Sequence, residues 1–497
     1  MKNFKILIPK ILLLFLLLAG MNFLYRYIFL PKDLQEHSDI VNLIKEMVRD
    51  SCEIVYVGES SNITVRWDDR DKRAISNMIA DYFPAKKMGD MTKAASHAGI
   101  YYEMLRNIPE NSTVKTVIVT MNLRSFDAGW RYSHLETPLQ KSIVLLKKRP
   151  ALFNRFMLSF KGYEIQTDEY RDTTIAEAYR NDILKFPYPF PYKTVDEWDK
   201  ARALTPIVNP DSLSGIDYTS LACNYIKTFA FQIDTLTNPR IKDFDHIVSL
   251  AKKRGWKLIF NLMAENMEKV QQLLGDDLLF LMRQNRDLLL QRYNKDGVMV
   301  VDNLDAVPNE EFIDQDWTTE HYAQKGRRIV ASNVAQNLKS IYSADYKEFM
   351  EDNNLHCEFF CDCEIAHFWL QWQTVTDELS YSPHHASKIA GGNPYSVTFE
   401  YPIKYLPDSM SKMQVEMYVY QTTANAEAQI IMQVDGNDSY SLSYPVSSLL
   451  LPGKTWQKIN CTFPLEERFY KNDRVKFFLH NRSWEWIYID DILVKFE

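Results

Sequence analysis

Glycine is scarce in this chain of 497 residues, which has 15 glycines, or about 3% against a usual 7% or so. A glycine next to a candidate active-site turn therefore stands there by chance less often than in an average sequence. The sequence has no large basic block and its net charge is −7, so we expect no nucleic-acid partner. With 46% hydrophobic and 25% charged residues, the composition is that of a globular protein with two or three domains.

Cysteine is also sparse, with six unevenly spaced residues that exclude a disulfide scaffold. Cys357, Cys361 and Cys363 cluster near His356 and His367, which is the composition of a possible zinc site. Paired CxxC spacing is absent, so we expect no metal, and nothing in the sequence calls for a cofactor. One disulfide or plain buried thiols are the two alternatives for these cysteines.

The N-terminal segment, residues 1–31, is typical of a membrane-targeting sequence. Three lysines precede the uncharged run from Ile11 to Tyr25, and Arg26 follows it. The run offers a poor signal-peptidase site and no cysteine for a lipid anchor. Since the flanking apolar residues extend it past 20 residues, we expect an uncleaved helix in the inner membrane. The excess of lysines before the run predicts that everything after residue 31 faces the periplasm.

Residues 32–345 alternate helical and strand patterns, as a doubly wound α/β domain does. The expected strands are 54–57, 114–121, 256–263 and 297–302. The expected helices are 39–48, 72–81, 92–106, 242–254, 276–293 and 323–342.

Two polar residues stand where this pattern places chemistry. Ser60 follows an apolar β-rich run that stops at Gly58, so it lies at the open edge of the sheet. His321 lies in a loop directly before a helix, where it can act as a general base. Each has a plain alternative, since the serine turn can be a helix cap and the histidine a surface residue.

Together these stretches resemble the SGNH/GDSL hydrolase superfamily. Val57-Gly58-Glu59-Ser60 is similar to its Gly-Asp-Ser block, with glutamate in place of aspartate, and His321 with Gly326 is similar to its histidine block. The resemblance implies a serine hydrolase with Ser60 as nucleophile and His321 as base. It further implies an oxyanion hole formed by the Ser60 and Gly89 backbone N–H groups and the Asn122 amide.

The acid of the implied triad does not stand at the family's usual position. The residue three before the histidine is Thr318, where the family has aspartate. We expect Asp316 to take that role, with Asp314 and Glu320 as rivals. Without a carboxylate, the histidine would be oriented by a backbone carbonyl and base catalysis would weaken.

From residue 346 to 497, helical patterns give way to short alternating segments separated by turn residues. This predicts an antiparallel β-sandwich whose last strands resemble jelly-roll modules of the carbohydrate-binding type. The tryptophans in this region are candidates for stacking on sugars or for the core: Trp369, Trp372, Trp456, Trp484 and Trp486.

The sequence thus predicts an SGNH-type doubly wound parallel sheet with a C-terminal jelly roll. Its build is similar to membrane-anchored proteins of bacterial cell-envelope acylation and to SGNH proteins of Bacteroidetes. We expect a serine esterase acting on an ester-decorated glycan of the cell envelope. The alternatives are an O-acyltransferase of the same glycan class and a non-catalytic glycan-binding scaffold.

Overall fold

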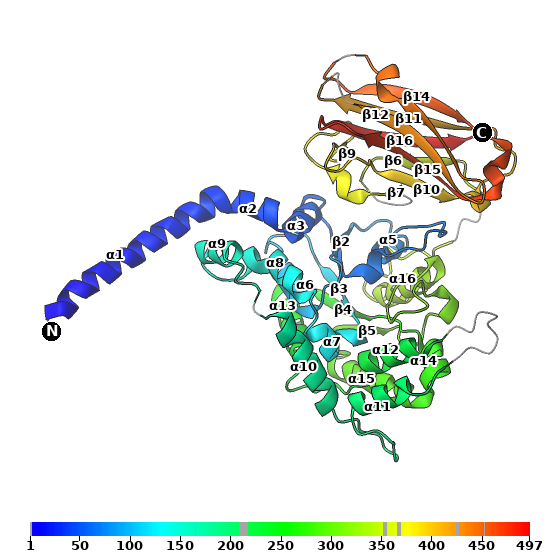
Figure 1. Ribbon diagram of the computed structural model, residues 1–497. Helices are drawn as coiled ribbons and strands as arrows, with labels where there is room; N and C mark the ends of the chain where they lie inside the picture. Colours follow the sequence, from blue (N-terminus) through cyan, green and yellow to red (C-terminus); the bar gives the residue numbers. More distant parts are fainter. Residues whose placement is uncertain are drawn as a thin grey trace. The chain divides into compact units, whose positions relative to one another are not determined.

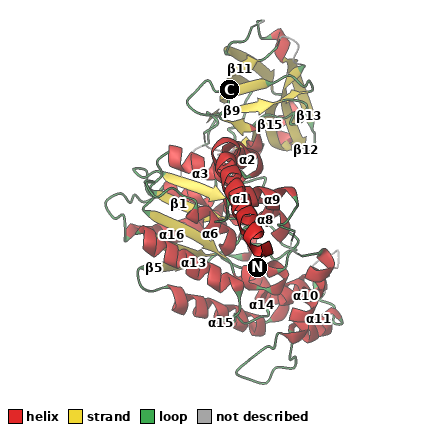
Figure 2. Cartoon of the chain, turned by 90° about the vertical axis from the view of Figure 1, so that its left-hand side faces the viewer, coloured by secondary structure: helices red, strands yellow, loops and turns green. Residues whose placement is uncertain are grey.

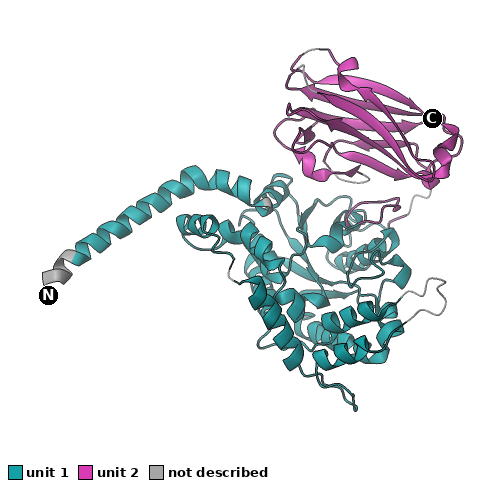
Figure 3. Ribbon diagram, in the orientation of Figure 1, with its two compact units in different colours: residues 1–64, 75–348 teal, residues 65–74, 349–497 magenta. Residues whose placement is uncertain are grey.

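The computed structural model describes residues 2–164, 166–207, 217–350, 355–364, 369–423, 427–451 and 453–497. It divides into two compact units (Figure 3). Unit 1 comprises Met1–Thr64 and Ile75–Glu348, and unit 2 comprises Val65–Ala74 and Phe349–Glu497. The expected boundary after residue 345 is therefore displaced by three residues. The segment Val65–Ala74 was expected in the α/β domain but belongs to unit 2.

Unit 1 is built around a parallel five-stranded sheet in the order β2-β1-β3-β4-β5. The strands are β1 (Ile54–Gly58), β2 (Met88–Thr92), β3 (Thr116–Met121), β4 (Lys257–Leu262) and β5 (Val298–Asp302). Helices lie on both faces of this sheet (Figure 1). β1 and β3 are buried along their whole length, as strands of a sheet covered on both faces are.

The helices that cover this sheet are contributed by segments far apart in the chain, with α5 packed on α16 and α6 packed on α13. The helices of unit 1 are α1 (Lys2–Leu24), α2 (Leu30–His37), α3 (Asp39–Arg49), α4 (Ser60–Ile63), α5 (Ile75–Ala80), α6 (Ala98–Arg106), α7 (Ala128–Arg131), α8 (Glu136–Ile143), α9 (Ala151–Ser159), α10 (Asp168–Asn181), α11 (Val195–Ala203), α12 (Thr219–Phe229), α13 (Pro239–Arg254), α14 (Met267–Leu274), α15 (Asp276–Tyr293) and α16 (Gln324–Lys339).

The strand β2 was not expected from the sequence. Met88–Thr92 contains a Gly-Asp pair, which is typical of a turn, yet it pairs with β1 over five residues. As a consequence, the helix expected over 92–106 begins only at Ala98. The helix expected over 72–81 is shortened to Ile75–Ala80, since the residues before Ile75 belong to unit 2.

Unit 2 is a sandwich of two antiparallel sheets, and Figure 2 shows how strands dominate it while helices dominate unit 1. One sheet has the order β13-β12-β15-β10-β7, and the other has the order β14-β11-β16-β9-β8, with β6 paired to β16. The strands are β6 (Glu358–Cys361), β7 (Trp369–Leu370), β8 (Val375–Thr376), β9 (Ala386–Ile389), β10 (Thr398–Pro402), β11 (Lys412–Gln421), β12 (Ala428–Gly436), β13 (Tyr440–Pro445), β14 (Gln457–Pro464), β15 (Asn472–Asn481) and β16 (Ile487–Phe496).

The long strands of unit 2 alternate buried and partly exposed residues, so that one face of each sheet lies in the core. In β11, for example, Met413, Val415, Met417 and Val419 are fully buried. This period of two confirms the β-sandwich expected from the sequence.

The N-terminal part of the chain is apolar and helical. Leu7–Leu34 spans 28 residues, which is long and apolar enough to cross a membrane. By length and composition, the helix has the character of a membrane anchor or of a signal sequence.

Candidate active site

The first strand delivers a serine to the carboxyl edge of the sheet. β1 ends at Gly58, where a side chain does not fit, because a Cβ there would stand 2.7 Å from the Tyr56 ring. Ser60 lies two residues further on and begins the short helix α4. We call residues 58–62 the serine turn. It follows β1 at the point where the strand order reverses, which is where open α/β sheets bind their ligands.

Ser60 and His321 lie in hydrogen-bond contact. Nε2 of His321 is 3.0 Å from Oγ of Ser60, and its Nδ1 is 2.7 Å from Oδ2 of Asp314. The carboxylate, the imidazole and the hydroxyl thus stand in the order of an acid-base-nucleophile triad. In this order the carboxylate holds the proton on Nδ1 and leaves Nε2 to exchange a proton with the serine.

The carboxylate beside His321 is that of Asp314, and the expectation of Asp316 is corrected accordingly. Both belong to the loop of residues 313–322, which we call the histidine loop. The Ile313 N–H donates to the His321 carbonyl at 2.9 Å, which brings the next residue, Asp314, beside the ring. Asp316 lies further out in the loop and is exposed, and Glu320 is buried but points to another partner.

Of the two other residues expected to bind an oxyanion, the structure brings one to the serine. β1 and β3 pair in register, so Asn122, which directly follows β3, lies level with Ser60. Gly89 pairs with Val55 inside β2, well before the carboxyl edge, and cannot contribute its N–H there. This expectation is wrong because the Gly-Asp pair was read as the loop after a strand when it is part of the strand.

The loop that does follow β2 helps to line a pocket beside the serine turn. Ala95 in this loop has a φ of 59°, a conformation that is uncommon outside glycine. The hydroxyl of the neighbouring Ser96 is buried and has no hydrogen-bond partner in the described part of the chain. Residues that line the pocket include Glu59, Ala95, Ser96, Asn122, Arg124 and Trp130. Sequence reasoning missed the loop because it missed β2.

A buried arginine ties the serine turn to the histidine loop. Nη1 of Arg124 donates to the Thr318 carbonyl at 3.1 Å, and its Nη2 forms an ion pair with Glu320. The same Nη2 lies 3.9 Å from Oε2 of Glu59. Arg124 is only 4% exposed, and a buried charge is costly unless it is paired. Its partners in the two loops are therefore held together by one guanidinium.

The carboxyl groups around Arg124 are strongly perturbed. Burial raises the pKa of Glu320 to about 7, and the Arg124 charge opposes this rise. Burial, followed by the charge of Glu320, raises the pKa of Glu265 well above its usual range. At neutral pH we therefore expect Glu265 to carry its proton, so that one cation faces at most two carboxylates.

Asn62 anchors the serine turn from behind. Its Nδ2 donates to Asp90 at 2.8 Å, and its Oδ1 accepts from the Ser76 N–H at 2.9 Å. The hydroxyls of Ser76 and Thr92 also donate to Asp90. Burial raises the pKa of Asp90, and these hydrogen bonds oppose part of the rise. Asn62 is fully buried, so its N-x-T sequence is inaccessible for glycosylation in the folded chain.

Unit 2 carries a row of aromatic side chains on the outer face of one sheet. Tyr381 stacks on Tyr418 with ring centroids 3.5 Å apart, and the Lys388 ammonium lies 4.1 Å from the Trp486 ring centroid. Trp456 contacts both Tyr381 and its neighbour in the row, Tyr420. We call this set the aromatic surface, formed by Tyr381, Tyr418, Tyr420, Trp456, Trp486 and Tyr488.

The tryptophans expected to bind sugar or fill the core divide between these roles. Trp369 is 3% exposed and belongs to the core of the sandwich, and Trp372 packs against that core. Trp456 and Trp486 belong to the aromatic surface, and Trp484 is 80% exposed. His367, a candidate zinc ligand by its place in the sequence, lies outside the described residues.

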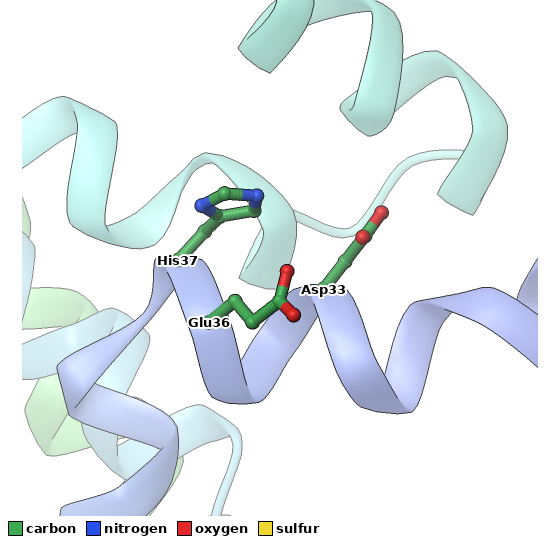
Figure 4. Close-up of side chains that lie close together, drawn as sticks. All are labelled: Asp33, Glu36 and His37. Atoms are coloured by element: carbon green, nitrogen blue, oxygen red, sulfur yellow. The ribbon is translucent and has the colours of Figure 1, made fainter. Parts of the chain in front are cut away.

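Among the described residues, one cluster of side chains has the spacing of metal ligands. Asp33, Glu36 and His37 place ligand atoms within 4.8 Å of one another on α2 (Figure 4). Asp33 already accepts a hydrogen bond from Tyr25 and pairs with Arg155 at 3.0 Å, which is the ordinary role of a surface carboxylate. The six cysteines are free thiols, and most of them are buried.

Comparisons with known proteins leave the family of the chain open. No protein-family model and no curated protein match it. Among solved structures, it is similar to the CBM22-1 xylan-binding domain of Paenibacillus barcinonensis Xyn10C, with 10% identity over 24% of this chain and 78% of that chain and a TM-score of 0.19. The CBM22-2 domain of the same protein has 12% identity over 28% of this chain and 99% of that chain, with a TM-score of 0.22. A family 16 carbohydrate-binding module has 15% identity over 25% of this chain and 89% of that chain, with a TM-score of 0.19. Likeness at these scores carries no argument about function, and the chain is characterised by the geometry of its own sites.

Proposed function

We propose that the chain is a serine esterase or O-acyltransferase that acts on an ester-decorated glycan. The observation that carries this proposal is the hydrogen-bonded series of Ser60, His321 and Asp314 at the carboxyl edge of the sheet. Its position at the reversal of strand order, beside a pocket, supports a ligand site rather than a chance contact. The resemblance of the same stretches to the SGNH superfamily points to the same chemistry.

In the proposed mechanism, His321 removes the proton of Ser60 as Oγ forms a bond to the acyl carbonyl carbon. The electron pair of the carbonyl moves onto its oxygen, which the Asn122 amide stabilises. Collapse of this intermediate breaks the bond to the glycan oxygen, and that oxygen takes the proton from Nε2. Water or a sugar hydroxyl then attacks the acylated Ser60, and the same nitrogen takes and returns the proton. Water as acceptor gives an esterase, and a hydroxyl as acceptor gives a transferase.

The test is labelling of the full chain, purified in detergent, with a fluorophosphonate probe that reacts with activated serines. Ser61→Ala is a matched control, because Ser61 is the adjacent residue and its buried hydroxyl has no partner in the described part of the chain. We expect prompt labelling of the wild type and of Ser61→Ala, and none of Ser60→Ala. A folded wild-type protein that stays unlabelled would contradict the proposal.

We propose glycan binding by the aromatic surface as a second function of the same chain. Exposed aromatic rings stack on the apolar faces of sugar rings, and Lys388 and Glu378 next to them offer hydrogen-bonding groups. If the triad proves inactive, this surface would support the alternative of a glycan-binding scaffold. Retardation of the protein in gels that contain a soluble polysaccharide measures this binding directly.

We also propose that the N-terminal helix anchors the protein in the inner membrane, with both units in the periplasm. The support is the length of Leu7–Leu34 and the lysines that precede it. Retention in the membrane after carbonate extraction, together with digestion by protease added to spheroplasts, is the expected result. Release of the protein by carbonate would indicate a cleaved signal.

A further inference from the structure

We propose that Glu59 is a positioning residue that controls whether Ser60 is ready to react. This inference rests on the proposed function of Ser60. Oγ of Ser60 lies 2.8 Å from Oε2 of Glu59 and 3.0 Å from Nε2 of His321. A serine hydroxyl has one proton, so it can donate to only one of these two acceptors at a time.

The carboxylate is firmly placed for this competition. Glu59 is 1% exposed, and its Oε1 accepts the Ser61 N–H at 3.1 Å as the cap of α4. Its Oε2 is shared between the Ser60 hydroxyl and the Arg124 guanidinium, which is 3.9 Å away. An ionised carboxylate is only an acceptor, so in this arrangement the serine proton points to Glu59.

The consequence for the histidine follows from hydrogen counting. If Ser60 donates to Glu59, the 3.0 Å contact to His321 is a hydrogen bond only when Nε2 itself carries a proton. A ring with protons on both nitrogens cannot accept another, so it is not a base. The reaction requires the hydroxyl to turn its proton to a bare Nε2. Glu59 must then release that proton.

The surroundings of Glu59 suggest what favours release. Arg124 is its alternative partner, and the Glu320 carboxyl group competes for the same guanidinium. Glu59 and Arg124 both line the pocket beside the serine turn. Ser60 is therefore ready to react when Glu59 pairs with Arg124 and no longer accepts the proton of the serine hydroxyl.

The experiment compares Glu59→Gln with the wild type by the rate of fluorophosphonate labelling. The glutamine keeps the size of the side chain, its carbonyl can still cap the Ser61 N–H, and its amide can donate to Oγ. The serine proton is then directed to His321, and we expect labelling to be faster by about tenfold or more, which is a part of the 10²–10⁴-fold acceleration that general-base catalysis typically gives. Glu59→Asp and Ser61→Ala serve as controls. The first keeps a carboxylate, and the second keeps the backbone N–H that Glu59 accepts, so neither should accelerate labelling.

A second measurement keeps the inference testable even if the wild type is never labelled. The ¹⁵N shifts of the His321 ring, assigned by comparison with His321→Gln, report which nitrogens carry protons. Measured at one pH, the two proteins should differ, with Nε2 carrying a proton in a smaller fraction of Glu59→Gln than of the wild type. Equal protonation in both proteins, or equal or slower labelling of a folded Glu59→Gln, would overturn the role of Glu59. Absence of labelling in every variant, with the ring change present, would instead overturn the proposed activity.

Discussion

Nδ1 of His321 lies 2.7 Å from Oδ2 of Asp314, while Asp316, two residues further along the same loop, is exposed. This difference makes the two aspartates a matched pair. They share one loop, and the same substitution to asparagine removes the same charge from each. Only one of them touches the imidazole.

Asp314→Asn should lower acyl turnover by about 10⁴, the loss seen when the acid of the best-studied serine triad is replaced, because the wrong tautomer of the histidine is then favoured. Asp316→Asn should leave turnover within about twofold. Hydrolysis of a chromogenic acetyl ester, corrected with Ser60→Ala, measures both variants. Equal losses of turnover in the two variants would mean that the loop rearranges and that Asp314 alone is not the acid of the triad.

The stability of unit 1 should depend on Glu320 in a predictable direction. Its pKa is raised by burial to about 7 from 4.5, so the folded state binds a proton more tightly than the unfolded state does. Such a group stabilises the fold below about pH 4.5, and that contribution is lost as pH rises toward 7. Glu320→Gln should remove it, so the unfolding free energies of wild type and variant should diverge by roughly 3 kcal/mol between pH 4.5 and 7.5. Parallel pH profiles in urea unfolding would contradict the raised pKa.

Glycan binding should depend on the aromatic surface and not on exposed tryptophan in general. Trp486 is 43% exposed and lies on this surface, whereas Trp67 is 45% exposed and contacts Arg474 of the other sheet. Trp486→Ala should weaken polysaccharide binding by about 1–3 kcal/mol, the range known for aromatic side chains that stack on nucleic-acid bases. Trp67→Ala should not. Affinity electrophoresis measures polysaccharide binding by both variants. A larger loss of binding in Trp67→Ala would place the glycan site on the other sheet.

A buried ion pair holds Val65–Ala74 to the sandwich. Nζ of Lys72 lies 3.1 Å from Oε1 of Glu400, and both side chains are nearly inaccessible. Arg474 and Lys476 also lie 3.5 Å from Glu400. Glu400→Gln removes the carboxylate that pairs with the buried Lys72, whereas Arg474 and Lys476 keep Asp435, and it should cost about 3–5 kcal/mol. Lys72→Met should cost less, because Glu400 keeps two partners. Urea unfolding followed by tryptophan fluorescence measures this order, and the reverse order would contradict it.

Much of the fold could be predicted because the responsible residues act locally. The strands around Ile54–Val57 and Val117–Met121 are continuous apolar runs, and α15 shows its helical spacing from Asp276 to Tyr293. β2 escaped prediction because its stability comes from pairing with β1 and from hydrogen bonds to Asp90, which no local pattern reveals. The assignment of Val65–Ala74 to unit 2 has the same cause, since its partners lie more than 300 positions away.

The residues of the candidate site also divide into those that the sequence predicts and those that it does not. Ser60, Asn122 and His321 lie directly after strands or before a helix, so the topology of the sheet brings them together. The choice between Asp314 and Asp316 depends on how the histidine loop closes, through a backbone hydrogen bond from Ile313 that spacing alone does not specify. The role of Arg124 depends on burial between two distant loops, and burial of a charged residue runs against what composition predicts.

The segment Val65–Ala74 also sets an order of events during synthesis. It leaves the ribosome directly after the serine turn, yet Glu400, to which Lys72 binds, follows 328 positions later. At about 5–20 residues per second, the segment waits roughly 16–66 s for its partner. During that interval the α/β unit can complete its sheet, and the hydrogen bonds of Asn62 to Asp90 and Ser76 can already hold the serine turn. The segment Val65–Ala74 still lacks its partner, so a chain that stops before Glu400 carries Lys72 without the carboxylate that it pairs with.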